Sequence, residues 1–160
     1  MTKLLLAVHV LAAIITIGPV TVAAGMFPPA VRRAAGAPDD PSGLTTVRTL
    51  HRICRVYAGI AVAVPVFGLA TANSLRVLGS AWLITSIALT ALAAAVLGAR
   101  VLPRQGAALS ALGEPAGGTV ESGAVLRTAR QLGMYTGLFN LLWATVTVLM
   151  IIRPGSTTGA

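Results

Sequence analysis

Charged residues are confined to limited parts of the chain, and long apolar stretches separate them. Residues 4–31, 56–75, 77–99 and 131–152 contain no Asp, Glu, Lys or Arg and are 28, 20, 23 and 22 residues long. Because an α-helix rises about 1.5 Å per residue, roughly 18 to 20 apolar residues cross the hydrocarbon core of a bilayer. The pattern predicts an all-α, polytopic membrane protein: a bundle of four transmembrane helices forming one domain over residues 1–160.

The expected spans are about 4–24, 56–73, 81–99 and 133–152, which leave two long connections at 25–55 and 100–132. Composition supports this interpretation, since 56% of residues are hydrophobic and 10% are charged. An ordinary soluble domain has roughly 45–50% and about 25%. These values exclude a soluble globular enzyme, a disulfide-stapled secreted domain and an intrinsically disordered chain.

Basic residues are distributed unevenly between the two sides of the predicted bundle. The two long connections carry nine of the twelve: Arg32, Arg33, Arg48, Arg52, Arg55, Arg100, Arg104, Arg127 and Arg130. The opposite side carries only Lys3, Arg76 and Arg153. Because Lys and Arg near spans are retained in the cytoplasm, both long connections are expected to be cytoplasmic and both termini extracytoplasmic. The basic residues behind the net charge of +8 are thus interpreted as signals that set the membrane topology, and no nucleic-acid partner is expected.

The first span has an alternative interpretation as a signal peptide, with Lys3 before an apolar core and a cleavage site after Val22-Ala23-Ala24. The span interpretation is the leading one. The single cysteine, Cys54, lies at the predicted cytoplasmic edge of span two, where thiols stay reduced, and it cannot close a disulfide within the chain.

Proline and glycine predict where the helices are interrupted. Pro28-Pro29 and the segment 37–43 are typical of a loop, with Ser42 as the N-cap of a helix that begins in the cytoplasm before it enters the bilayer. Pro65 and Gly68 predict a kink in span two, because proline removes a backbone donor. Spans two and three are joined by a short connection at 74–80, so they are expected to be antiparallel neighbours.

His9 is the one ionisable side chain expected deep within a span. Its helix face continues through Ala12, Ala13 and Thr16, which favours contact with other helices over contact with lipid. Ser86 on span three and Thr147 on span four are expected at a similar depth. Two interpretations remain open: a neutral histidine that is hydrogen-bonded within the bundle, and a ligand or proton-handling residue.

Span four carries the clearest packing motif. Gly133 and Gly137 form a G-x-x-x-G pair, and the same face continues through Asn140, Ala144 and Thr147. Small residues at this spacing let a neighbouring backbone approach closely. Asn140 and Thr16 both fall near the middle of their spans, so they are a candidate interhelical hydrogen-bonded pair. Together His9, Thr16, Ser86, Asn140 and Thr147 make up the candidate intramembrane polar site.

No catalytic constellation is present in the sequence. The spans hold no carboxylate, lysine or arginine, and the chain has no C-x-x-C, H-E-x-x-H, G-x-S-x-G or glycine-rich phosphate loop. His51 lies more than about 20 Å from His9 along the membrane normal, so the two histidines cannot share one haem iron. Met150 is closer to His9 in depth, and a His9/Met150 pair is therefore considered for haem or copper. The leading expectation is that the protein is not an enzyme and carries no cofactor.

Several short segments resemble a known family. These are Lys3-Leu-Leu-Leu-Ala-Val-His9-Val-Leu-Ala-Ala, Gly18, Trp82-Leu-Ile-Thr-Ser86, Pro103-Arg-Gln105, Leu149-Met150 and Pro154. Together they resemble the predicted integral membrane proteins grouped as domain of unknown function family 2269. This resemblance implies a bacterial four-helix membrane protein without an established activity. The early histidine also resembles the HemJ-type protoporphyrinogen oxidases and the CopD-type copper resistance proteins, but a deep lysine for the former and a second deep histidine for either are lacking.

Three functions follow from these observations. The leading one is a structural or accessory subunit of the bacterial plasma membrane, with the lipid bilayer and a second copy or another membrane protein as partners. The alternative is a haem- or metal-binding redox protein centred on His9. The third is a small transporter that uses the kink between Pro65 and Gly68.

Overall fold

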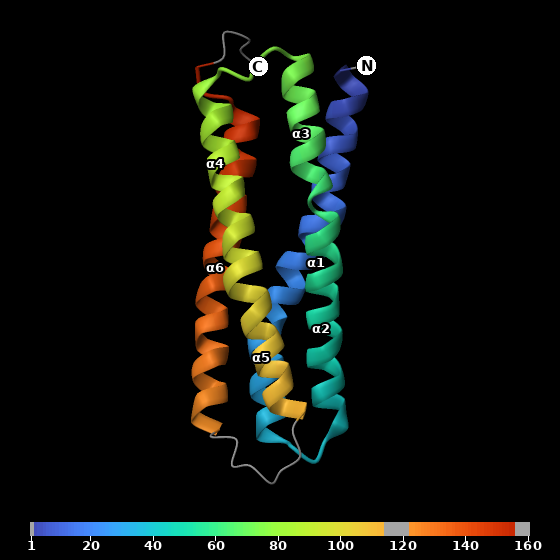
Figure 1. The fold of residues 1–160 in the computed structure, drawn as a ribbon, viewed down its shortest axis with the longest axis vertical. Coiled ribbons are helices and arrows are strands. Elements are labelled where there is room, and N and C mark those ends of the chain that lie inside the picture. Colours follow the sequence, from blue (N-terminus) through green and yellow to red (C-terminus); the bar gives the residue numbers. More distant parts are fainter. Residues whose placement is uncertain (1, 114–121, 156–160) are drawn as a thin grey trace.

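The computed structural model describes residues 2–113 and 122–155, and all regular elements in these ranges are helices. Four helical segments are long and apolar enough to cross a membrane: Lys3–Gly36, Pro41–Ser74, Ala81–Gly113 and Gly123–Ile152. They run side by side along the long axis of the molecule (Figure 1). The expected all-α architecture with four apolar helices is confirmed.

The first segment is one helix, α1, over Thr2–Gly36. It continues through Pro19, Pro28 and Pro29, although Pro28-Pro29 predicted the start of a loop. Prolines are tolerated inside membrane helices because neighbouring groups replace the lost hydrogen bonds, and Pro28 is buried against the rest of the bundle. The predicted connection 25–55 is therefore mostly helical, and the turn between the first two segments is limited to residues 37–40.

The second segment is divided into α2, Pro41–Ile60, and α3, Ala63–Ser74. The N-cap of α2 is Asp40, whose side chain accepts a hydrogen bond from the Ser42 backbone N–H, so the prediction of Ser42 as the cap was wrong by two residues. The two helices are separated at Ala61 and Val62, just before Pro65, which lacks the N–H that would bond to the Ala61 carbonyl. The Ala61 carbonyl accepts from the Val64 N–H instead, at 3.0 Å. The expected interruption of span two is confirmed.

The third segment contains α4, Ala81–Val96, a π-helical turn, η1, Leu97–Val101, and α5, Leu102–Gly113. The π-helical turn comes directly before Pro103, and within it the Leu102 N–H bonds to the Leu97 carbonyl. The fourth segment is the single helix α6, Ser122–Ile152. Most of the predicted connection 100–132 is helical as well, because α5 extends to Gly113 and α6 starts at Ser122.

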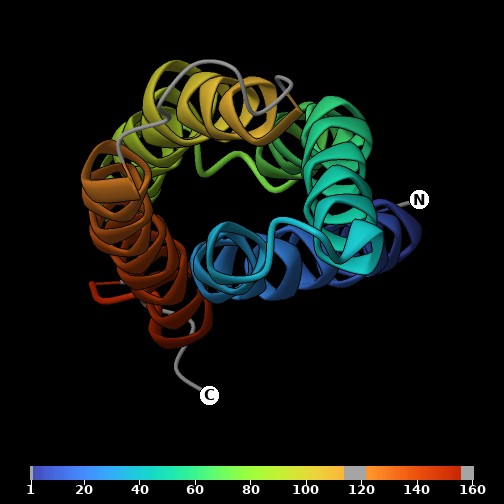
Figure 2. The same cartoon turned by 90° about the horizontal axis from the view of Figure 1, so that it is seen from below.

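The molecule has two distinct ends. At one end, here called the loop end, α1 turns into α2, α5 finishes and α6 starts; the other end, called the termini end, holds the start of α1, the 75–80 connection and the end of α6 (Figure 1). Seen from the loop end, the helices form a ring in which α1 lies between α2 and α6, and α5 lies near α2 (Figure 2). The start of α1 and the end of α6 therefore lie at the same end of the bundle.

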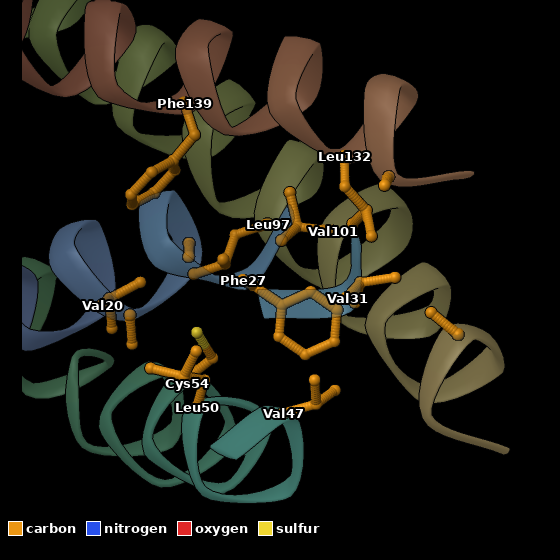
Figure 3. Close-up of a cluster of buried hydrophobic side chains, with 14 of the residues drawn as sticks. Val20, Phe27, Val31, Val47, Leu50, Cys54, Leu97, Val101, Leu132 and Phe139 are labelled. Carbon is orange, nitrogen blue, oxygen red and sulfur yellow. The ribbon is translucent and has the colours of Figure 1, made fainter. Parts of the chain in front are cut away.

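A hydrophobic core fills the loop-end half of the ring. Phe27 on α1 is fully buried and lies between the side chains of α2 and those of η1, with Val47 and Cys54 on one side and Val101 on the other (Figure 3). Residues from α1, α2, α4, η1, α5 and α6 all contribute to this cluster. All four segments are thus held together at this end.

The termini-end half is open on one side. There α3 packs against α1, and α4 packs against α6, but α3 and α4 make little or no contact with each other. Spans two and three, predicted at 56–73 and 81–99, were expected to be neighbours, but the segments that contain them touch mainly beyond these ranges, where α2 contacts α5.

Candidate functional site

His9 links α1 to α3. Its Nδ1 lies 2.9 Å from the carbonyl oxygen of Val64 and donates to it, because a carbonyl oxygen can only accept a hydrogen bond. The ring rests against Gly68, where an added Cβ would come within 2.9 Å of the His9 Cε1. The break at Ala61 and Val62 and the glycine at position 68 therefore make room for the imidazole beside α3.

The polar residues expected near His9 bond within their own helices. The Ser86 hydroxyl is buried and donates to the Trp82 carbonyl at 2.8 Å. The Thr147 side chain is exposed and its hydroxyl donates to the Trp143 carbonyl at 3.0 Å. The hydrogen-bond partner of His9 is thus a backbone carbonyl on span two, which no pattern of side-chain types could identify.

The predicted pair between Thr16 and Asn140 is not formed. The Thr16 hydroxyl is buried and donates to the Ala12 carbonyl of its own helix at 2.7 Å. The Asn140 Oδ1 is buried without a hydrogen-bond partner, as is the Thr136 hydroxyl one turn earlier on α6. The prediction was wrong because a threonine in a helix satisfies its hydroxyl most readily on the carbonyl four residues before it.

The glycine pair of α6 does not pack against another helix of the chain. Both Gly133 and Gly137 are exposed, and a Cβ added at either position would have no atom within 4 Å. Ala144 and Thr147 on the same face are exposed too. Within the described residues α6 instead buries the neighbouring face, which carries Leu132, Phe139 and other core residues, so packing of the glycine face against another helix stays a prediction.

A polar cluster near the loop end was not foreseen. Gln105 on α5 is fully buried, its Oε1 lies 3.2 Å from the His51 Nδ1, and its Nε2 donates to the Cys54 Sγ at 3.5 Å. The edge of the His51 ring also meets Phe27, with centroids 6.5 Å apart. The available signal was the presence of one amide residue within the otherwise largely apolar segment 105–112.

The haem or copper site considered from the sequence has His9 and Met150 as its ligands, and only His9 is a residue type that binds metals strongly. In residues 2–113 and 122–155 no three His, Cys, Asp or Glu side chains are grouped so that they could hold a metal ion. Met150 is half-buried on α6, and its carbonyl accepts a hydrogen bond from the Arg153 Nε at 3.3 Å. The pairing of His9 with Met150 stays a prediction.

Two surface grooves lie at the loop end. One is formed by α1 and the first turns of α2, and is lined by Arg32, Arg33, Asp40 and neighbouring residues. The other is formed by α2 and α5 and is lined by three arginines, His51, Val56 and Leu109. Hydrogen bonds from the Ser42 hydroxyl and the Ser42 backbone N–H hold the pKa of the Asp40 carboxyl below its ordinary value.

Compared with protein-family models, with curated proteins and with solved structures, the chain has no match. The function is therefore argued from the arrangement of its own residues.

Proposed function

We propose that this protein is a structural or accessory subunit of the bacterial plasma membrane, which assembles with a second copy or with another membrane protein through α6. The observation that carries the proposal is the exposed pair Gly133 and Gly137, where an added Cβ would have no atom of the described residues within 4 Å. The cytoplasmic side is proposed to be the loop end, because nine of the twelve basic residues are in or beside its connections.

Two exposed glycines in the interior of a long helix need a physical reason. Glycine lowers helix stability by about 1 kcal/mol relative to alanine, so Gly133 and Gly137 weaken α6 without contributing to the chain's own packing. In a bilayer, helix association depends on close van der Waals contact, which small residues four positions apart allow. A helix from outside the chain is the partner that fits this face.

The use of both histidines supports a structural role. His9 joins α1 to α3, and His51 joins α2 to α5 through Gln105. Each imidazole therefore serves as a link between helices.

The assembly can be tested with two matched double variants. Gly133→Leu/Gly137→Leu places bulk on the α6 face, and Gly18→Leu/Gly25→Leu places the same bulk on α1, where an added Cβ also meets no atom within 4 Å. Each protein is extracted with surrounding lipid by a membrane-solubilising polymer at native expression level, and its mass is measured by native electrophoresis.

We expect the wild type and the α1 variant to migrate as an assembly larger than one chain, and the α6 variant to migrate as a single chain. A wild-type protein that is already a single chain would contradict the proposal. Equal behaviour of the two variants would show that the glycine face is not the contact.

The alternative function, a haem- or metal-binding protein centred on His9, is favoured by one specific observation. Ligating histidines usually donate their second ring N–H to a carbonyl or carboxylate, and His9 does so to Val64 through Nδ1. An absorption spectrum of the purified protein tests it. A Soret band that is lost in His9→Ala would establish a haem protein, and its absence from wild-type protein grown with haem would leave the structural role.

A further inference from the structure

The groove between α2 and α5 has an unusual concentration of positive charge. It encloses about 490 Å³ and is lined by Arg48, His51, Arg52, Arg55, Val56 and Leu109. The three arginines are exposed, and their spacing of four and three residues places them on one face of α2. The groove therefore presents several guanidinium donors to one small volume.

None of these charges is neutralised by the chain as far as it is described. In residues 2–113 and 122–155, no carboxylate is paired with Arg48, Arg52 or Arg55. Like charges so close together on a helix repel each other and destabilise it unless an anion lies between them. Guanidinium groups bind phosphate through two parallel hydrogen bonds, so phosphate is the anion that this arrangement favours.

The groove continues into an apolar strip along α2. Arg48, Arg52, Val56 and Ile60 follow one another at intervals of four residues, so they form one line along the helix. Val56 is 49% exposed and Ile60 is 51% exposed. The line therefore passes from two cationic side chains to two exposed apolar side chains at the point where the uncharged stretch 56–75 begins.

The second wall of the groove is held in place. Gln105 on α5 bonds to both His51 and Cys54 on α2, and it is fully buried. Because Leu109 follows Gln105 by one helical turn, this contact also sets the distance between Leu109 and α2. The groove is thus a feature built by two fixed helices.

We propose that this groove binds one anionic phospholipid, with the phosphate between Arg48, Arg52 and Arg55 and an acyl chain along Val56 and Ile60. Along α2 the cationic side chains come first and the apolar side chains follow, which is the order of the headgroup and the acyl chain in such a lipid. A free phosphate ion would use the arginines but not the exposed apolar strip, so the membrane lipid is the better fit. A zwitterionic lipid would bring its own cation into a groove that already has three.

The proposal is tested on the full-length, delipidated protein in detergent by native mass spectrometry with phosphatidylglycerol, phosphatidylcholine or inorganic phosphate added. The site variant is Arg48→Gln/Arg52→Gln/Arg55→Gln. The control, Arg32→Gln/Arg33→Gln/Arg130→Gln, removes the same number of charges from the same end of the molecule, so both variants change the net charge from +8 to +5.

We expect the wild type and the control each to retain one phosphatidylglycerol molecule. The amount of phosphatidylglycerol retained by the site variant should be at least five-fold lower. Phosphatidylcholine should be retained much less by the wild type. Equal losses in both variants would show general attraction to the basic end and overturn the proposal. Equal retention of phosphatidylcholine, or displacement of the lipid by millimolar phosphate, would overturn it as well.

A second variant keeps the test decisive if the triple variant does not fold. Val56→Glu changes one exposed position and places a carboxylate beside Arg52, in the groove itself. It should lower phosphatidylglycerol retention at least three-fold with an unchanged circular dichroism spectrum. Unchanged retention in folded Val56→Glu would also overturn the proposal. The result is independent of the α6 assembly, because the groove and the glycine face lie on different helices.

Discussion

At the scale of single residues, most serine and threonine hydroxyls bond within their own helix, whereas His9 and Gln105 connect helices. His9 bonds to a carbonyl on α3, and Gln105 bonds to two side chains on α2. In an apolar environment such bonds have no competing water, and a group left without one is destabilising. The buried oxygens of Thr136 and Asn140, which have no partner, are the exceptions in the described residues.

The contact between His9 and Gly68 gives a direct prediction. In Gly68→Ala the new Cβ would lie 2.9 Å from the His9 Cε1, and the ring cannot move freely because Nδ1 is bonded to Val64. We expect a loss of about 1–3 kcal/mol in the free energy of unfolding, typical of overpacking. Thermal unfolding of the purified protein in detergent measures it.

Two controls accompany this prediction. Gly59→Ala on the same segment has no atom near the new Cβ, so it should be neutral or stabilising by up to about 1 kcal/mol. In a His9→Ala background, Gly68→Ala should have a much smaller effect, since the clashing ring is gone. An equal effect in both backgrounds would contradict the role given to His9.

Sequence reasoning identified the residue types at the site but not their partners. His9 was recognisable because it is the one histidine inside a charge-free stretch, whereas its acceptor is a backbone oxygen that any residue could provide. Thr16 and Asn140 were predicted to pair because they were expected at the same depth in the membrane. That argument ignores that a threonine hydroxyl readily reaches a backbone carbonyl of its own helix. Gln105 was missed because a single amide gives no periodic signal.

At the scale of the helices, the four apolar segments could be predicted and their ends could not. Charge-free stretches of about 20 residues are unambiguous, but α1, α5 and α6 extend well beyond them. Pro28-Pro29 was interpreted as a breaker because proline destabilises helices in water. In α1 this segment is packed against the other helices, with Phe27, Pro28 and Val31 buried, so packing outweighs the local preference of proline.

The start of α2 offers a pH-dependent test. Asp40 caps the helix as a carboxylate, and its pKa is lowered, first by the Ser42 hydroxyl and then by the Ser42 N–H. Its stabilising effect is complete above the ordinary pKa of 3.8 and is lost as the pH falls below that value through the lowered pKa. Asp40→Ala should therefore be less stable than the wild type at pH 7, with a difference that shrinks towards pH 2.

Asp40→Asn is the matched control, because asparagine accepts the same hydrogen bonds at every pH. Its melting temperature relative to Asp40→Ala should not change between pH 7 and pH 2. A constant difference between wild type and Asp40→Ala across that range would contradict the capping role of the carboxylate.

At the scale of the whole molecule, the loop end is a closed ring and the termini end is open between α3 and α4. The start of α1, the end of α6 and the 75–80 connection share the open end (Figure 1). The proposed orientation, with the loop end in the cytoplasm, can be tested with cysteine labelling. The native Cys54 is unsuitable, since its side chain is fully buried and would not react from either side.

Single cysteines in a Cys54→Ser background solve this problem. Ala37→Cys lies in the exposed turn of the loop end, and Gly79→Cys lies in the exposed connection of the termini end. A membrane-impermeant maleimide should label Gly79→Cys in intact cells and Ala37→Cys only after lysis. The reverse pattern would refute the orientation.

The arginines at the loop end also affect how readily the protein could reverse its orientation in the membrane. Nine arginines against four acidic residues leave a surplus of five positive charges in and around the two loop-end connections. With the negative side of the membrane potential at that end, carrying this surplus across would require about 12 kcal/mol of electrical work at 100 mV, before any desolvation is counted. In the orientation proposed above, the membrane potential therefore opposes insertion the other way up, and chains that assemble through α6 are expected to point in the same direction.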